Sequence, residues 1–248
     1  MYLFRTLLLL LSVFIINQCK PKTDDDIISN ALIIFNESEE RKFTESQKNQ
    51  IQKIIPATEM KVRSLLPGLP DSITVQLEIV DWDLKEIGGV TGRTQTNNPP
   101  VVLIQVSEKY PGGLSKAIDM GLEYVIFHEF HHLYRGWAIQ DNRFEQGISI
   151  AAINEGLAVV FSSEHTGKVF TADSPPESSI AESWVDEILD LPTTAHYGTW
   201  MFEHPDGRRA IGYKAGNYIV SKAISNSGLD ILELSELSVE KIYEHAGY

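Results

Sequence analysis

The stretch His128-Glu129-Phe130-His131-His132 holds the residue types from which metal-dependent hydrolases build their centres. On a helix, a four-residue step returns to nearly the same face one turn along, so His128 and His132 can bind one metal ion together. Glu129 is rotated off that line and can act as a general base on a metal-bound water. The pattern therefore predicts a Zn²⁺ site with two histidine ligands and an adjacent base. We expect His131 to play a structural or supporting part rather than to bind the metal.

The sequence before this motif predicts the helix that the motif needs. Apolar residues recur there at helical spacing: Ile118, Leu122, Val125 and Ile126. Gly136 follows the last histidine closely and is a typical helix stop. We therefore expect the motif on an amphipathic helix, with His128 emerging from a buried turn. The alternative is a chance cluster of histidines at a polar helix end.

A catalytic zinc needs a third protein ligand and one open position for water. The metzincin continuation H-x-x-G-x-x-H is excluded, because Arg135 and Ala138 occupy the positions of its glycine and its third histidine.

Glu155 is the strongest candidate for the third ligand. It is the only charged residue in the apolar segment Ile148 to Phe161, which is expected to form a buried helix. A buried carboxylate is costly unless it is paired, protonated or bound to a metal. The alternative partner is a cation such as Arg135, and Glu164 and His165 are weaker ligand candidates near a polar helix end.

Three sequence blocks follow one another along the chain: HEFHH at 128–132, NEGLA at 154–158 and GYKAGNYIV at 212–220. Together they resemble a gluzincin-like family of predicted zinc-dependent proteases, long catalogued as a domain of unknown function. The resemblance spans roughly Ile73 to the C-terminus. It implies an α+β, zincin-like fold: a small twisted sheet, then the HExxH helix, a Glu-ligand helix and a helical C-terminal part. It also implies zinc held by His128, His132 and Glu155.

Two features of the site stay open at this stage. Thermolysin-like gluzincins carry an Asp four residues after the glutamate ligand to orient a histidine, and Val159 stands there in this chain. The donor that would stabilise the oxyanion is either Tyr213 or His196, and the alternative for Tyr213 is an ordinary core aromatic.

The N-terminus predicts export. Arg5 precedes an apolar run from Leu7 to Ile16, which is too short to span a membrane and is typical of a signal peptide. Cys19 follows at the position of an acylated lipobox cysteine, although Gln18 departs from the small residue usual there. We expect a signal peptide with a lipidation cysteine at 1–19, a polar tether at 20–30, and one zincin-like metallopeptidase domain at 31–248. The alternative is an ordinary signal peptide cleaved nearby.

Composition narrows the classes of partner. Cys19 is the only cysteine, so an intramolecular disulfide is excluded. The formal net charge of −13 argues against nucleic acid as a partner. We expect an exported bacterial lipoprotein anchored to the cell envelope, on its periplasmic or surface side.

Periodicity predicts the elements that surround the motif. We expect strands at Ser72–Trp82 and Val101–Val106, and helices at Thr44–Leu66, Glu177–Leu189 and Arg209–Ser225, the first of them capped by Ser46. In the second helix, Ile180, Trp184 and Ile188 are expected to face inward. Either Val90–Thr94 or Val101–Val106 is expected to be an edge strand that pairs with a substrate backbone, the alternative being a simple hairpin.

These features predict a zinc-dependent peptidase that hydrolyses peptide bonds through a metal-activated water, with Glu129 as general base. The alternative is a non-catalytic surface lipoprotein that binds a metal or a peptide. Retention of Glu129 beside the ligands favours the enzyme, since a purely structural zinc site needs no base.

Overall fold

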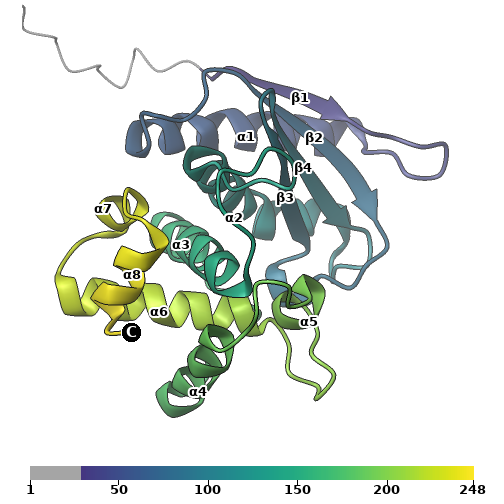
Figure 1. Ribbon diagram of the computed structural model, residues 1–248. Helices are drawn as coiled ribbons and strands as arrows, with labels where there is room; N and C mark the ends of the chain where they lie inside the picture. The colour runs from purple at the N-terminus through teal and green to yellow at the C-terminus, as the bar shows by residue number, and fades with distance from the viewer. Residues whose placement is uncertain (1–28) are drawn as a thin grey trace, which may run out of the picture.

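The computed structural model describes residues 29–248, which form an α+β fold with one small sheet and a larger set of helices (Figure 1). The strands are β1 (Ala31–Phe35), β2 (Ile73–Val80), β3 (Val90–Asn97) and β4 (Pro100–Ser107). The helices are α1 (Glu45–Leu65), the 3-10 turn η2 (Lys85–Ile87), α2 (Gly113–Arg135), α3 (Ile148–Thr166), α4 (Ser178–Leu189), α5 (Tyr197–Met201), α6 (Ile211–Ser227), α7 (Ile231–Ser235) and α8 (Val239–Ala246). The predicted class is confirmed, and the arrangement is compatible with a zincin-like fold.

Residues 1–28, with the predicted signal peptide and Cys19, lie outside the described residues. Within residues 29–248, no helix combines the length and the apolarity that crossing a membrane requires.

The sheet has the strand order β1-β2-β4-β3, with β3 alone running antiparallel to its neighbour. Alternate residues of β2 are buried in the core that the sheet shares with the helices: Ile73, Val75, Leu77 and Ile79. The opposite face of β1 stays open, since Leu32 is 57% exposed. The sheet is therefore covered on one side, which is the side that carries the motif helix (Figure 1).

β3 is an edge strand of this sheet and β4 is interior, because β4 pairs with β2 on one side and β3 on the other. The C-terminal end of β3 is covered on its outer side, where Thr94 and Gln95 accept the backbone N–H groups of Ile139 and Gln140. Of the two predicted edge segments, Val90–Thr94 therefore lies on an edge strand and Val101–Val106 does not. The backbone of β3 bulges between Thr94 and Thr96.

Capping residues fix the start of α1 and the end of the motif helix α2. The N-cap of α1 is Thr44, not Ser46 as predicted, because Thr44 and Gln47 form a reciprocal capping box. α2 ends at Gly136, whose φ of 81° is the left-handed conformation that glycine favours, so the chain turns away just after the last histidine.

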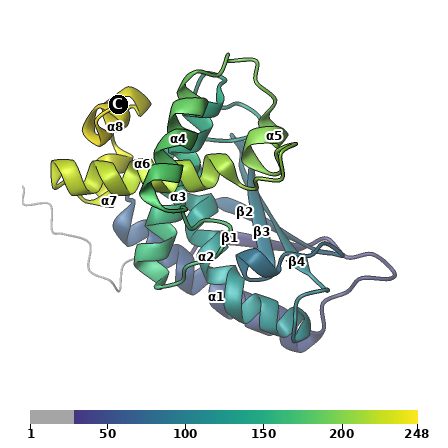
Figure 2. The same cartoon turned by 90° about the horizontal axis from the view of Figure 1, so that it is seen from below.

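Helices α3 and α6 cross in backbone contact (Figure 2). A Cβ atom on Gly156 would lie 2.2 Å from the carbonyl carbon of Gly216, and one on Gly216 would lie 1.9 Å from the oxygen of Ala152. Only glycine fits at both positions. The crossing point is thus one residue away from Glu155.

Candidate metal centre

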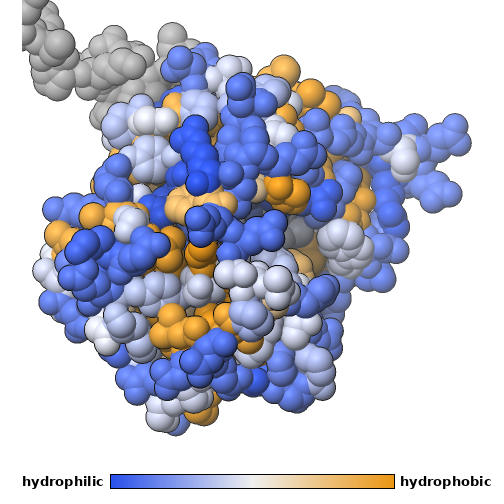
Figure 3. Space-filling model, viewed as in Figure 1, coloured by the Kyte–Doolittle hydropathy of each residue, from blue (hydrophilic) through white to orange (hydrophobic). Residues whose placement is uncertain are grey.

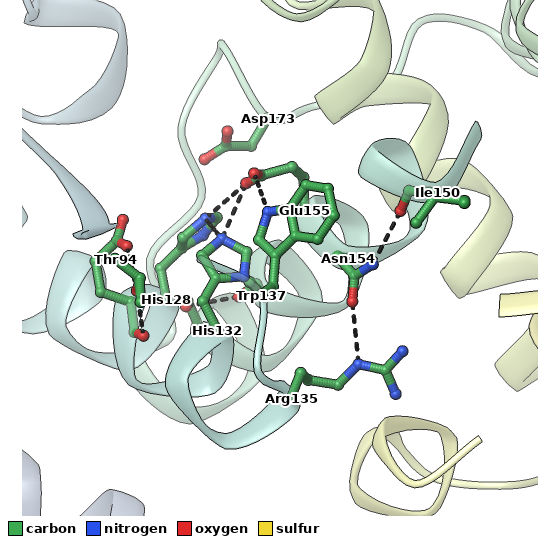
Figure 4. A network of polar contacts seen from close by, with 12 residues as sticks. Thr94, His128, His132, Arg135, Trp137, Ile150, Asn154, Glu155 and Asp173 are labelled. Atoms are coloured by element: carbon green, nitrogen blue, oxygen red, sulfur yellow. Dashed lines mark hydrogen bonds and ion pairs between the residues drawn. The ribbon is translucent and has the colours of Figure 1, made fainter. Parts of the chain in front are cut away.

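Two helices bring the three predicted ligands together (Figure 4). His128 and His132 lie one turn apart on α2, with their Nε2 atoms 3.0 Å from each other. Glu155 comes from α3, and its Oε2 lies 3.1 Å from each of these nitrogens. All three side chains are buried or nearly so, with His132 and Glu155 each 4% exposed.

We call the three atoms His128 Nε2, His132 Nε2 and Glu155 Oε2 the triangle. Hydrogen bonds among them cannot account for all three short distances. Each Nε2 carries at most one proton, and an ionised carboxylate oxygen carries none. If one imidazole donates to the other, the accepting nitrogen faces Oε2 lone pair to lone pair. If both are protonated, their two hydrogens oppose each other. A cation turns all three lone pairs into ligands, and two imidazoles with one carboxylate form a zinc donor set whose atoms sit about 3.4 Å apart in a tetrahedral shell.

The second oxygen of Glu155 is held from the other side. Its Oε1 accepts hydrogen bonds from Trp137 Nε1 at 3.0 Å and from the Tyr197 hydroxyl at 3.3 Å. Contacts with the two histidines keep the pKa of Glu155 below its ordinary value against the opposing effect of burial. The carboxylate therefore stays ionised, as a zinc ligand must.

Arg135 is not the partner of Glu155. Its Nη1 donates to the backbone oxygens of Ser235 and Leu237 at 2.6 and 2.8 Å, and its Nε donates to Asn154 Oδ1 at 3.2 Å. The ion-pair alternative for Glu155 is thus excluded by the contacts that Arg135 makes instead.

Glu129 lies beside the triangle with its carboxylate buried and 3% exposed. Burial raises its pKa to about 7. The hydroxyl of Thr94, on β3, lies 3.1 Å from Glu129 Oε2. A group with a pKa near neutrality is suited to take up and release a proton at physiological pH.

His131 faces away from the ligands and ties α2 to α7. Its Nε2 lies 2.8 Å from the Ser235 hydroxyl, which itself donates to the oxygen of Ile231, so the histidine is the donor. Burial lowers its pKa well below the ordinary value and keeps the ring neutral. This agrees with the structural part expected for it.

The two candidate oxyanion donors lie in different places. Tyr213, on α6, is half-buried and lines the cleft over the triangle. Burial raises its pKa well above the ordinary value, so its hydroxyl keeps its proton. The exposed His196 does not line the cleft; its Nδ1 accepts the backbone N–H of Thr199 at 3.2 Å and caps α5. The neighbouring Tyr197 reaches the site in its place.

Asp173 is a buried acid near the site that the sequence analysis did not predict. Val159 is buried and supplies no acceptor for a histidine, and His132 Nδ1 has no hydrogen-bond partner among the described residues. Asp173, from the loop after α3, lines the cleft and accepts the Tyr124 hydroxyl at 2.8 Å. Burial raises the pKa of Asp173.

The triangle opens into a cleft of about 1040 Å³ between β3 and the helices α5 and α6. Figure 3 shows a recess on this face between the sheet and the helices, with hydrophobic residues visible within it. Exposed apolar side chains line its walls: Trp82, Ile139, Tyr197 and Phe202. An extended peptide segment fits such a space.

Comparison with known proteins gives one match. The family model of DUF2268, described as a predicted Zn-dependent protease, matches residues 106–244, from the end of β4 into α8. The matched region contains the triangle, Glu129 and Tyr213. It begins later than Ile73, where the sequence resemblance was expected to start. No curated protein and no solved structure matches the chain.

Proposed function

Because this chain belongs to the DUF2268 family of predicted Zn-dependent proteases, we propose that it is a zinc peptidase that cleaves peptide bonds by hydrolysis. The description of the family supports zinc as the cofactor and a peptide or protein as the substrate. The observation that carries the proposal is the convergence of His128 Nε2, His132 Nε2 and Glu155 Oε2, which lie 3.0–3.1 Å apart at the base of an open cleft.

In this proposal, His128, His132 and Glu155 hold the ion. Bound zinc lowers the pKa of a water toward about 7 and polarises the scissile carbonyl. Glu129 accepts the proton of the attacking water and then donates it to the leaving amine. Trp137 and Tyr197 fix the orientation of Glu155 by donating to its Oε1.

Tyr213 is proposed as the donor to the developing oxyanion, in preference to His196. Its hydroxyl is protonated, and its ring lines the cleft on the side opposite β3. A donor already fixed in a water-poor site stabilises developing charge without reorganisation. His196 is committed to the first turn of α5.

The substrate backbone is proposed to add to the outer edge of β3 before Thr94, whose backbone oxygen already accepts the N–H of Ile139. Residues Val90 to Thr94 line the cleft, and Glu129 lies directly against this part of the strand. Main-chain hydrogen bonds to a sheet edge hold a peptide extended while leaving its side chains free to enter neighbouring pockets.

Two nearly isosteric substitutions test the proposal together. Glu155→Gln replaces a ligand with a neutral amide, and we expect it to lose both zinc and activity. Glu129→Gln leaves the ligands intact, and we expect it to keep stoichiometric zinc while kcat falls by roughly 10² or more. Metal content, melting temperature and cleavage of a peptide library, with and without a chelator, are measured side by side.

The non-catalytic lipoprotein is the competing outcome of the same experiment. This alternative is supported if zinc-loaded wild type cleaves no peptide and Glu129→Gln binds peptides as wild type does. Retention of zinc by Glu155→Gln would place the third ligand elsewhere.

Lipid anchoring through Cys19 at the cell envelope is a separate proposal, supported by the apolar run and the cysteine that follows it. Expressed in a bacterium with labelled fatty acid, the wild type should be labelled and partition with membranes, and Cys19→Ser should not. Persistent labelling of the variant would contradict it.

A further inference from the structure

We infer that Thr94 is the positioning residue for Glu129: from strand β3, its hydroxyl fixes the carboxylate of the base in the orientation that faces the metal ligands. This inference rests on the proposed function. It adds a role for a residue outside both metal-binding helices.

Three groups from two elements surround the Glu129 side chain. From β3, Thr94 Oγ1 lies 3.1 Å from Oε2, and Thr94 is the one side chain within residues 29–248 that forms a hydrogen bond with this carboxylate. A Cβ atom on Gly92 would lie 2.7 Å from Glu129 Cγ and 2.8 Å from Oε1. It would also lie 2.8 Å from Cγ1 of Val125, one turn earlier on α2. The base thus occupies a socket of which β3 forms one wall.

The hydroxyl proton of Thr94 has two acceptors within reach. The backbone oxygen of Glu129 lies at 3.0 Å and its Oε2 at 3.1 Å. A carbonyl inside a helix already accepts the N–H four residues on, and a hydrogen bond to an ionised acceptor is roughly twice as strong as a neutral one. The proton therefore goes to Oε2 while Glu129 is ionised, which is the state in which it acts as base. Once Glu129 is protonated, the hydroxyl can turn to the backbone oxygen without any movement of the strand.

Thr94 is itself held on both sides of its strand. It lies opposite Val102 of β4, and its backbone oxygen accepts the N–H of Ile139 at 3.0 Å. The next residue, Gln95, accepts the N–H of Gln140 at 2.9 Å. The segment after α2 thus returns to clamp β3 at the bulge. A threonine held in this way imposes its geometry on the glutamate, not the reverse.

Gly92 lies two residues before Thr94, on the same face of the strand. Any side chain there would enter the space that Glu129 fills, so glycine leaves the room and threonine supplies the hydrogen bond. Both residues come from one strand and serve one carboxylate. This pairing distinguishes a built socket from a chance contact.

The test compares Thr94→Val and Thr94→Ser in zinc-loaded full-length protein. Valine keeps the shape and loses the hydroxyl, and we expect kcat to fall roughly tenfold with KM changed by less than about twofold. Zinc content should stay stoichiometric. Serine restores the hydroxyl, and we expect kcat within about threefold of wild type. Thr74→Val, on the open face of β2, is the matched control for loss of a strand threonine.

The decisive readout is the double variant. If Thr94 acts through Glu129, Thr94→Val has no further effect on kcat in the Glu129→Gln background. An equal loss in both backgrounds would overturn the inference, and so would full kcat in Thr94→Val. If Thr94→Val is too unstable to assay, Thr94→Ala and Thr94→Ser are compared below both melting temperatures, where equal kcat overturns the inference. Absence of any cleavage by wild type would defeat the proposed function and this inference together, whereas the other outcomes defeat the inference alone.

Discussion

Glu155 divides its two carboxylate oxygens between two tasks. Oε2 faces both histidines, and Oε1 accepts from Trp137 and Tyr197. A carboxylate free to rotate has no fixed preference between its oxygens, whereas this one is locked from behind by an indole and a phenol. The ligand is therefore aimed before any ion arrives, which reduces the ordering that binding must impose.

The buried base gives the metal-free protein a pH-dependent stability. Its pKa rises on folding from an ordinary value of 4.5 to about 7, so the folded state holds the proton more tightly than the unfolded state. The stabilisation is then complete below about pH 4.5 and is lost as pH rises through 7, by at most about 3 kcal/mol. We expect the melting temperature of metal-free wild type to fall between pH 5 and 8, and that of Glu129→Gln to fall less.

Subtraction of the two curves isolates Glu129, because His131 and Asp173 are present in both proteins. Metal-free protein is required, since a cation beside the carboxylate lowers its pKa. Parallel curves for the two proteins would mean that Glu129 does not hold a proton tightly in the fold.

Among the site residues, the sequence predicted those that belong to a recognisable local pattern. The four-residue step brought His128 and His132 together, and the lone charge in an apolar helix pointed to Glu155. Thr94, Trp137 and Tyr197 carry no such pattern, because each reaches the site from a segment whose position depends on the tertiary fold. The only hint of Tyr197 in the sequence was that it follows the candidate residue His196.

Among the elements, the crossing of α3 and α6 explains why two motif blocks contain glycine. Gly156 follows the Glu155 ligand on α3, and Gly216 faces it from α6. Because the two backbones touch, the depth at which Glu155 projects into the site is set by α6. The sequence block at 212–220 thus supports the block at 154–158.

Gly216→Ala should destabilise the protein by about 3 kcal/mol, the upper end of the usual cost of overpacking, since its Cβ would meet the backbone oxygen of Ala152 at 1.9 Å. Gly212→Ala is the matched control on the same helix, because its Cβ would meet the flexible side chain of Met201. We expect that variant to lose much less stability. Thermal or urea unfolding gives both values, and equal losses would show that the backbone contact is not limiting.

Sequence periodicity predicted the long elements better than the short ones. The helix at Glu177–Leu189 was confirmed as α4 within one residue, but Ile180 is 45% exposed while Ala181 and Val185 are buried, so the predicted inward face was partly wrong. β1 was not predicted. Its five residues alternate between half-buried and exposed at a sheet edge, and they become a strand through parallel pairing with β2, a long-range contact that local sequence does not encode.

Over the whole molecule, part of the exposed apolar surface gathers around the opening of the cleft. Ten large hydrophobic residues are exposed among residues 29–248, and four of them line the cleft: Trp82, Ile139, Tyr197 and Phe202. Scattered apolar residues need no explanation, but a cluster around a cavity marks a binding surface. We therefore expect the proposed peptidase to prefer substrates with large apolar side chains near the scissile bond.

Phe202→Ala should lower kcat/KM for peptides with Phe or Leu beside the scissile bond by roughly tenfold, and much less for matched peptides with Gly or Ala. Val169→Ala is the control, since Val169 is 71% exposed and does not line the cleft. Paired peptide assays measure the ratio, and an equal loss for both peptide classes would contradict the predicted apolar preference.

Because α6 follows α3 in the sequence, the contact between them forms late in synthesis of the chain. A growing polypeptide emerges from the ribosome N-terminus first, so all three ligands appear before Gly216 does. Until α6 has been made, α3 packs on α2 but lacks the backbone contact with Gly216 that limits its position. A half-made chain therefore carries every ligand and still lacks one of the contacts that position Glu155. For the peptidase proposed above, we expect this order to delay full activity until α6 has been made and the fold is complete.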